Sequence, residues 1–485
     1  MSGNLGNLGI SIFTKAVLQF GEPLFVSGGI MAKILQTLNI LVWGAPALIL
    51  ILGVGIFLTV RTGFAQFTLF PRAIRSFCAA FRRKKHTGDG VSPFQALCTA
   101  LAATVGTGNL AGVAGAICLG GPGSIFWMWV CGLLGMATKF AEATLAVRYR
   151  QEKDERYLGG PMYIIRQGIG NRFLAATYCV FGVIAAFGVG NATQINAVLD
   201  GINSIICRFG GSETQIRNLI IGILLAIPIG AMLLGGAKRI GRAAEKLVPF
   251  AAGAYILLCL VVLLMRWRQI PMAFSSMIQG AFSPRAVTGG MLGSAFTALR
   301  VGCARGVFTN EAGMGTAAIA HGSAVVDHPA RQGLMGIMEV FLDTIVICTM
   351  TALVILTSGV PIPYGTDSGA ELTVRAFSAV CGGWVDIVIT AALCCFAFAT
   401  VLGWGLYGVQ CAEYLWGGRG WKLFALVQST AVVVSSVMDT GIIWMVSETV
   451  NGLMAIPNLI ALALLSPELV RLTIEFKRKR TAPHV

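Results

Sequence analysis

Residues 102–112 read AATVGTGNLAG and stand inside an apolar segment that runs from Pro93 to Ala116. Each glycine costs an α-helix about 1 kcal/mol relative to alanine, so a helix is expected to break here. A second segment, residues 305–316, reads RGVFTNEAGMGT and also combines glycines with threonine and asparagine. Both segments are therefore predicted to be unwound in the middle of an apolar stretch.

The amino-acid composition indicates whether these two segments lie in water or in a lipid bilayer. Of the 485 residues, 56% are apolar and 12% are charged, about half the charged fraction of a soluble domain. A bilayer core requires about 20 apolar residues for each spanning helix, and such stretches recur along the chain. The sequence therefore predicts an all-α polytopic membrane protein that lies in a lipid bilayer.

About eleven transmembrane helices are expected, each about 20 residues long. We place them near residues 39–60, 93–116, 124–147, 174–199, 217–235, 247–265, 287–320, 334–357, 384–412, 423–437 and 442–465. They form a single transmembrane domain over residues 37–466. An interfacial, extracytoplasmic segment, residues 1–36, precedes this domain, and a basic cytoplasmic tail, residues 467–485, follows it.

The net charge of +15 arises from Lys and Arg in the connections between these helices. The connections assigned to the cytoplasm, together with the tail, carry 25 of these residues, whereas the opposite side carries 8. Cytoplasmic loops are enriched in Lys and Arg. We therefore predict a cell inner membrane protein with its N-terminus outside and its C-terminus in the cytoplasm. No nucleic acid partner is expected, because the basic residues are explained by topology.

The two interrupted segments occupy equivalent places in two halves of the chain. When the helix at 39–60 is set aside, they belong to the first and sixth of ten helices, in repeats of five at 93–265 and 287–465. Because five is odd, the two halves are inverted in the membrane. Paired glycine-interrupted helices are the best sequence indication of a transporter's binding site near the bilayer midplane. The competing interpretation, close helix packing at glycine, does not account for the Thr and Asn residues in both segments.

The unwound backbone also predicts the kind of cargo. Free backbone groups at membrane depth need partners. Helix N-termini suit a carboxylate, and free carbonyls suit an ammonium group or a sodium ion. A zwitterion of amino-acid size meets both requirements. The absence of charged residues from Pro93 to Ala116 argues against a charged substrate.

Two further helices offer polar side chains. Asn191 and Gln194 are three residues apart, hence on one helix face, and they could bind substrate or hold neighbouring helices together. Thr400 and Trp404 also share a face, and they could offer a hydroxyl oxygen to sodium and a wall to the substrate. The alternative for Trp404 is an anchor at the membrane interface.

Charged residues inside the helices are expected to be mostly structural. Lys139 and Glu142 can pair at three residues' spacing, and Glu339 and Asp343 lie in the first turns of their helix. Glu311 directly follows the second break. For Glu311 we expect a structural ion pair, with Arg300 or Arg305 as partner, while a gating or proton-carrying role stays open.

These residues resemble the alanine or glycine:cation symporter family, the sodium:alanine symporters. The similarity covers nearly the whole chain and is most specific from Ala96 to Arg150, with TVGTGN (104–109), GGPG (120–123) and MATKFAE (136–142). Further similar motifs are GGPMY (159–163), GVFTNEAG (306–313) and DTIV (343–346). The family often has Ser where this chain has Thr309. The resemblance implies the LeuT-like inverted-repeat fold of the amino acid–polyamine–cation superfamily and sodium-driven uptake of alanine or glycine, in some members also D-alanine.

The resemblance further implies where ligands bind. Sodium would bind at Ala102, Val105, Ala397 and Thr400. With the polar residues above, the expected substrate-binding set is Thr104, Gly106, Thr107, Gly108, Asn109, Asn191, Gln194, Asn310, Thr400 and Trp404. No catalytic residue is expected, and no cofactor apart from sodium as the coupling ion.

Three other functions compete with this one. A proton-coupled importer that uses Glu311 or His321 is the nearest alternative. A membrane-embedded enzyme lacks support, because the sequence has no HExxH motif, nucleophile elbow or His/Cys cluster, and a channel is a third possibility. We expect a monomer, although the sequence leaves an oligomer open, along with the preference between alanine and glycine.

Overall fold

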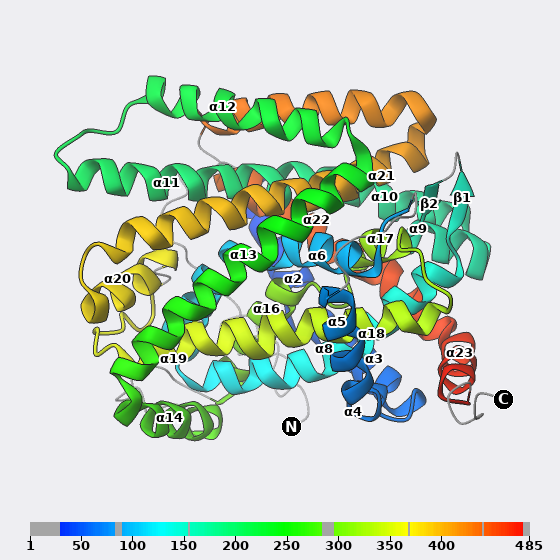
Figure 1. Cartoon of the computed structure of the whole chain (residues 1–485), viewed down its shortest axis with the longest axis horizontal. Coiled ribbons are helices and arrows are strands. Elements are labelled where there is room, and N and C mark those ends of the chain that lie inside the picture. The colour runs from blue at the N-terminus through cyan, green and yellow to red at the C-terminus, as the bar shows by residue number, and fades with distance from the viewer. Residues whose placement is uncertain are drawn as a thin grey trace, which may run out of the picture.

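The computed structural model describes residues 30–82, 90–153, 156–283, 295–366, 369–438 and 441–478. Almost all of its elements are helices (Figure 1). One small sheet is present among them, in which β1 (Gln151–Lys153) pairs antiparallel with β2 (Arg156–Leu158). The predicted interfacial segment 1–36 lies for the most part outside the described residues.

The described residues begin with four helices, which we call the entry helices, and these precede the first interrupted helix. The entry helices are α2 (Ile30–Val42), α3 (Ala45–Arg61), α4 (Ala65–Thr68) and α5 (Phe70–Arg82). The elements that follow are α6 (Pro93–Thr104), η1 (Gly108–Gly112), α7 (Val113–Gly120), α8 (Gly123–Arg148), α9 (Pro161–Tyr163), η2 (Ile164–Ile169), α10 (Arg172–Phe187), η3 (Gly188–Ala192), α11 (Thr193–Arg208), α12 (Gln215–Leu233) and α13 (Gly236–Met265). The segments η1, η2 and η3 are π-helical, a geometry that is frequent at functional sites.

The second part contains the other interrupted helix. Its elements are η4 (Trp267–Gln269), α14 (Ile270–Phe282), α16 (Ala295–Asn310), α17 (Thr316–Gly322), α18 (Pro329–Val340), the π-helical η5 (Phe341–Cys348), α19 (Thr349–Thr357), α20 (Gly369–Cys381), α21 (Val385–Ser435), α22 (Gly441–Leu464) and α23 (Ser466–Arg478). The long α21 is interrupted at Gly417, where φ is 72° and ψ is −161°. Figure 1 shows its later part turning back along α12.

The described helices are those of a multi-pass membrane protein. Seven of them are long and apolar enough to cross a membrane, or eight if the bent pair Pro93–Thr104 and Gly108–Gly120 is one span. The helix at Pro46–Arg61 is apolar but shorter. The described residues of the eleven predicted spans lie mostly in helices, two of the spans within α21, and residues 287–294 of the seventh span lie outside the described residues. The count of eleven and the five-plus-five repeat stay predictions.

The connections lie at two opposite ends of the helix bundle (Figure 1). Helices α14 and α20 and the turn between α11 and α12 lie at one end, and β1, β2, α9 and α23 lie at the other. The second end carries the basic connections that the sequence assigns to the cytoplasm. The molecule thus has two ends from which a cavity can open, and the assignment of these ends to the two sides of the membrane stays a prediction.

Helix α8 is the centre of the packing. It contacts α16, α17, α18, α3 and α14, and small residues let these helices approach closely. A Cβ atom on Gly123 would lie only 2.0 Å from the backbone carbon of Gly280 on α14. A Cβ atom on Gly302 of α16 would lie 2.2 Å from the carbonyl oxygen of Ser124. Such contacts between small residues are typical of helix packing in membranes, and they hold α16 against the core next to its break.

Candidate functional site

The first predicted break is present in the structure. Helix α6 ends at Thr104, Val105 is extended with φ −78° and ψ 102°, and the following helix is bent by 53°. Side chains replace the lost helical hydrogen bonds. The Gly106 amide donates to Asn109 Oδ1 at 2.9 Å, and the Ala102 carbonyl accepts from Thr400 Oγ1 at 3.0 Å. This break therefore lies directly against α21.

The second predicted break is present between α16 and α17. Residues Glu311, Gly313 and Gly315 have positive φ angles of 51°, 98° and 78°, so no helix can continue through them. Glu142 Oε1 accepts hydrogen bonds from the Gly313 and Gly315 amides, both at 3.0 Å, and from Asn458 Nδ2 at 2.8 Å. Two amides of the break, just before α17 begins, are thus bound by a carboxylate of the protein itself.

A buried charge cluster surrounds that carboxylate. Lys139 Nζ lies 3.1 Å from Glu339 Oε1 and 3.9 Å from Glu142 Oε2, and all three side chains are almost fully buried. His321 Nε2 lies 2.8 Å from Glu339 Oε2. The predicted structural pair of Lys139 and Glu142 is present, but the shorter contact joins Lys139 to α18. This cluster holds α8, α17 and α18 together around the second break.

A small cavity lies between the two breaks. It encloses about 30 Å³ and is lined by Ala103, Thr104, Gly106, Thr107, Gly108, Val189, Gln194, Phe308, Glu311, Thr400 and Trp404. Across it, Trp404 Nε1 donates to Glu311 Oε1 at 3.0 Å, and Thr107 Oγ1 donates to Gln194 Oε1 at 3.3 Å. Four separate helical segments therefore meet at one polar site, which we call the central cavity.

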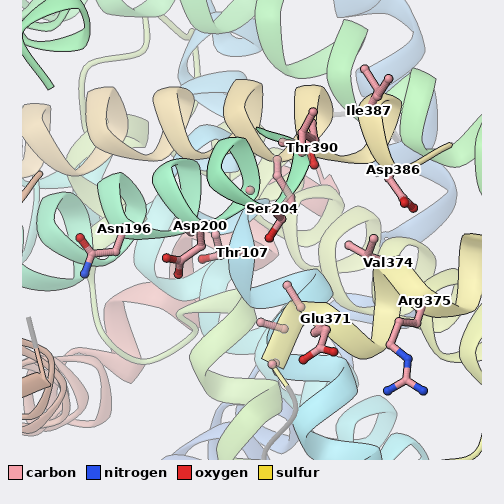
Figure 2. Close-up of a pocket in the computed structure, with 18 of the residues that line it drawn as sticks. Thr107, Asn196, Asp200, Ser204, Glu371, Val374, Arg375, Asp386, Ile387 and Thr390 are labelled. Carbon is pink, nitrogen blue, oxygen red and sulfur yellow. The ribbon is translucent and has the colours of Figure 1, made fainter. Parts of the chain in front are cut away.

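A larger cavity of about 920 Å³ adjoins the central cavity. Thr107, Gly108 and Phe308 line both, so Phe308 and the first break form the boundary between them. Figure 2 shows polar residues of α11, among them Asn196 and Asp200, opposite Glu371 and Arg375 of α20. Because α20 lies at the less basic end of the molecule (Figure 1), this outer cavity opens toward that end.

The structure brings most of the predicted substrate-binding residues to the central cavity. Seven of the ten line it, namely Thr104, Gly106, Thr107, Gly108, Gln194, Thr400 and Trp404. The indole of Trp404 is fully buried, so the interface-anchor interpretation of this residue is wrong.

Three predicted residues bond elsewhere in this conformation. Asn109 Nδ2 donates to Asp343 Oδ1 at 2.7 Å, and Asn310 Nδ2 donates to Thr344 Oγ1 at 3.2 Å. Asn191 Nδ2 donates to the Gln428 carbonyl at 2.9 Å. All three join helices to one another and line neither cavity, and their contact with substrate stays a prediction.

The site also contains residues that the sequence did not suggest for it. Ala103, Val189 and Phe308 line the central cavity as apolar walls, and no signal beyond their place in glycine-containing segments marked them. Glu311 lines it as well. The expected ion pair of Glu311 with Arg300 or Arg305 is wrong, because its partners are Trp404 and Thr316. The positive φ of Glu311 turns its side chain toward α21 instead.

The predicted sodium set occupies the same side of the first break. Ala102 and Thr400 are joined by a hydrogen bond, and Val105 and Ala397 are both buried. Helices α6 and α21 approach closely there, since a Cβ atom on Gly403 would lie 3.0 Å from Ala103. Carbonyl and hydroxyl oxygens are ligands that suit a hard cation. None of the four residues carries a charged side chain, and sodium binding by them stays a prediction.

The fold and the two cavities are those of a membrane transporter, with a small polar cavity between two interrupted helices. A solved structure of MhsT in complex with L-phenylalanine matches with a TM-score of 0.54, over 81% of this chain and 99% of that chain, at 14% identity. This similarity shows a common fold alone. The sequence matches the sodium:alanine symporter family over residues 29–484, and the chain belongs to that family.

Relatives of known name support this assignment. The sodium/alanine symporter AgcS of Methanococcus maripaludis is 44% identical, over 92% of this chain and 98% of AgcS. The amino-acid carrier protein AlsT of Bacillus subtilis is 35% identical, over 89% of each chain. The probable sodium/glutamine symporter GlnT of the same organism is 34% identical, over 93% of this chain and 92% of GlnT. The protein is therefore an amino acid symporter.

Proposed function

We propose that this protein imports a small neutral amino acid, alanine or glycine, together with sodium by alternating access. The observation that carries the proposal is the central cavity, where both interrupted helices meet Thr400 and Trp404. Its polar groups suit the two ends of a zwitterion, and its apolar walls suit a short side chain. The family and a relative that are named for sodium and alanine support the same substrate and coupling ion.

The cavities also support a direction of access. The outer cavity opens toward the end that carries few basic residues, which the positive-inside rule assigns to the outside. In this conformation the protein is thus outward-open, with Phe308 at the entrance to the central cavity. Closure around cargo and rocking toward the basic end would complete the transport cycle. The C-terminus is cytoplasmic in this arrangement.

Sodium provides the driving force in this proposal. Moving one charge through a potential of 100 mV yields about 2.3 kcal/mol, which corresponds to about fiftyfold accumulation of a neutral substrate. Uptake of labelled alanine into proteoliposomes tests it, with sodium or choline outside. We expect uptake only with sodium. Equal uptake with choline would contradict sodium coupling, and uptake driven by a pH step instead would favour the proton-coupled alternative.

Competition measures the size of the substrate side chain. Glycine, L-alanine and D-alanine are expected to compete with labelled alanine, serine more weakly, and leucine and glutamine about 100-fold more weakly. The reason is that extra methylene groups must displace the packed Trp404 and Phe308, at a cost of about 1–3 kcal/mol. Glutamine is included because one relative is named for it. Competition by leucine equal to that of alanine would contradict a small site.

Thr400→Val tests the sodium site. Valine keeps the shape of the side chain but removes the hydroxyl oxygen. We therefore expect the sodium concentration for half-maximal uptake to rise about tenfold, because this is the typical effect of losing one hydrogen-bonding group. Thr430→Val is the matched control. Thr430 is exposed on the same helix and donates to the carbonyl four residues before it, as Thr400 does. An unchanged sodium dependence in Thr400→Val would place the sodium site elsewhere.

A further inference from the structure

We propose that the Glu311 carboxylate receives the ammonium group of the transported amino acid, an inference that rests on the proposed function. Glu311 is the only acidic residue among those that line the central cavity within the described part of the chain. Its side chain therefore supplies the negative charge that one end of a zwitterion requires.

Most backbone carbonyls of the second break are not available to bind the ammonium group. Free carbonyls at such a break would suit an ammonium group, but in this structure most of them already accept hydrogen bonds. The Gly313 carbonyl accepts from Asn458 Nδ2 at 2.8 Å, and the Met314 carbonyl accepts from the Tyr178 hydroxyl at 3.1 Å. The Glu311 and Gly315 carbonyls accept from backbone amides. The break thus offers its side-chain carboxylate rather than its backbone.

The charge of Glu311 has no cationic partner in the described part of the chain. Glu311 is 3% exposed. Each carboxylate oxygen accepts one hydrogen bond from a neutral donor, Trp404 Nε1 at 3.0 Å and Thr316 Oγ1 at 2.6 Å. Lys139, the nearest buried cation, forms its ion pairs with Glu339 and Glu142. Because a buried charge without a counter-ion is costly, Glu311 gains from an incoming ammonium group.

The geometry holds the carboxylate ready for such a ligand. A positive φ of 51° is uncommon for a residue other than glycine, and strained backbone of this kind clusters at functional sites. The indole and hydroxyl donors fix the orientation of the carboxylate, and each oxygen keeps capacity for a further hydrogen bond. Thr107 and Gly108 of the first break line the same cavity, and backbone amides at such a break suit the carboxylate of the substrate, whereas the Gly106 amide already donates to Asn109 Oδ1.

This arrangement predicts how the protein selects zwitterions. A molecule without an ammonium group, such as lactate or propionate, would leave Glu311 buried and unpaired. Lactate has nearly the shape of alanine, with a hydroxyl in place of the ammonium group. Discrimination between these two ligands therefore reports on the charge of Glu311 rather than on the size of the cavity.

The test measures binding of L-alanine and L-lactate to the purified protein at fixed sodium and pH, for the wild type and for Glu311→Gln. Glutamine keeps the size and an acceptor oxygen for Trp404. We expect alanine binding to weaken about 10- to 150-fold, as for a lost charged hydrogen bond, while lactate binding is unchanged or tighter. Glu413→Gln is the matched control, because Glu413 lies on α21 and faces Lys153 at 3.7 Å.

Two results would overturn the inference. One is that Glu311→Gln binds alanine within threefold of the wild type. This includes the case in which the variant has lost only the pH dependence of uptake, the result expected if Glu311 carries a proton instead. The other is an equal loss for alanine and lactate. If Glu311→Gln does not fold, Glu311→Asp decides, since its retained charge must preserve the preference for alanine over lactate. The sodium dependence of wild-type uptake is measured separately. A result against sodium coupling can therefore be distinguished from a result against the role of Glu311 in binding the ammonium group.

Discussion

Replacing Glu142 with alanine is expected to abolish amino acid uptake and to lower the free energy of unfolding by about 3–5 kcal/mol. The substitution removes the acceptor of two backbone amides at the second break, those of Gly313 and Gly315, and of Asn458. It also leaves Lys139 with Glu339 as its remaining carboxylate within 4.0 Å. Uptake into proteoliposomes and chemical unfolding in detergent measure the two effects.

A graded series separates the hydrogen bonds of Glu142 from its charge. Glu142→Gln keeps an acceptor oxygen at the same place and is expected to be less damaging than alanine. Glu413→Ala is the control, because a partly exposed ion pair such as Glu413 with Lys153 is worth about 0–1 kcal/mol. Wild-type uptake by Glu142→Ala would show that the carboxylate does not hold the second break in its working geometry.

Replacing Gly190 with alanine is expected to reduce uptake strongly through a displacement of Trp404. A Cβ atom at position 190 would lie 2.2 Å from Trp404 Cβ and 2.6 Å from its Cγ. Such overpacking costs about 1–3 kcal/mol, and here it displaces the indole that donates to Glu311. Alanine binding, Trp fluorescence and uptake should all change together.

Gly253→Ala is the matched control for that substitution. Gly253 lies in α13, and a Cβ atom there has nothing within 4 Å. The added methyl group should leave uptake unchanged and favour the helix by up to about 1 kcal/mol. If Gly190→Ala transports as well as Gly253→Ala, the position of Trp404 is not important for cargo binding.

The two breaks could be predicted because their cause is local. Glycine, threonine and asparagine weaken a helix wherever they occur, and the structure leaves helical geometry at Val105 and again from Glu311 to Gly315. The membrane class follows equally from composition. These features depend on neighbours in sequence and not on the tertiary arrangement.

The faces of the helices were harder to predict. Asn191 and Gln194 were expected on one face, but Asn191 lies in the π-helical η3. A π-helix inserts an extra residue per turn, which rotates Asn191 toward Gln428 while Gln194 faces the cavity. Asn109 lies in η1 and is directed toward Asp343 in the same way. The spacing rule for an α-helix fails where the helix is widened.

Contacts between distant parts of the chain could not be read from the sequence. The predicted pair of Lys139 with Glu142 is local, whereas the shorter contact to Glu339 joins α8 and α18. Glu311 was expected to pair with an arginine of its own helix, but its backbone conformation directs it to Trp404. Both differences concern buried charges, whose partners depend on packing of the whole bundle.

The central claim is that the two interrupted helices share one cargo. The most direct measurement is an experimental structure of the protein with sodium and L-alanine, by cryo-electron microscopy or crystallography. We expect ligand density in the central cavity, with the alanine carboxylate at Thr107 and Gly108, its ammonium group at Glu311 and its methyl group toward Trp404. Density for alanine only in the outer cavity, or a central cavity filled by side chains in the presence of saturating alanine, would contradict the account.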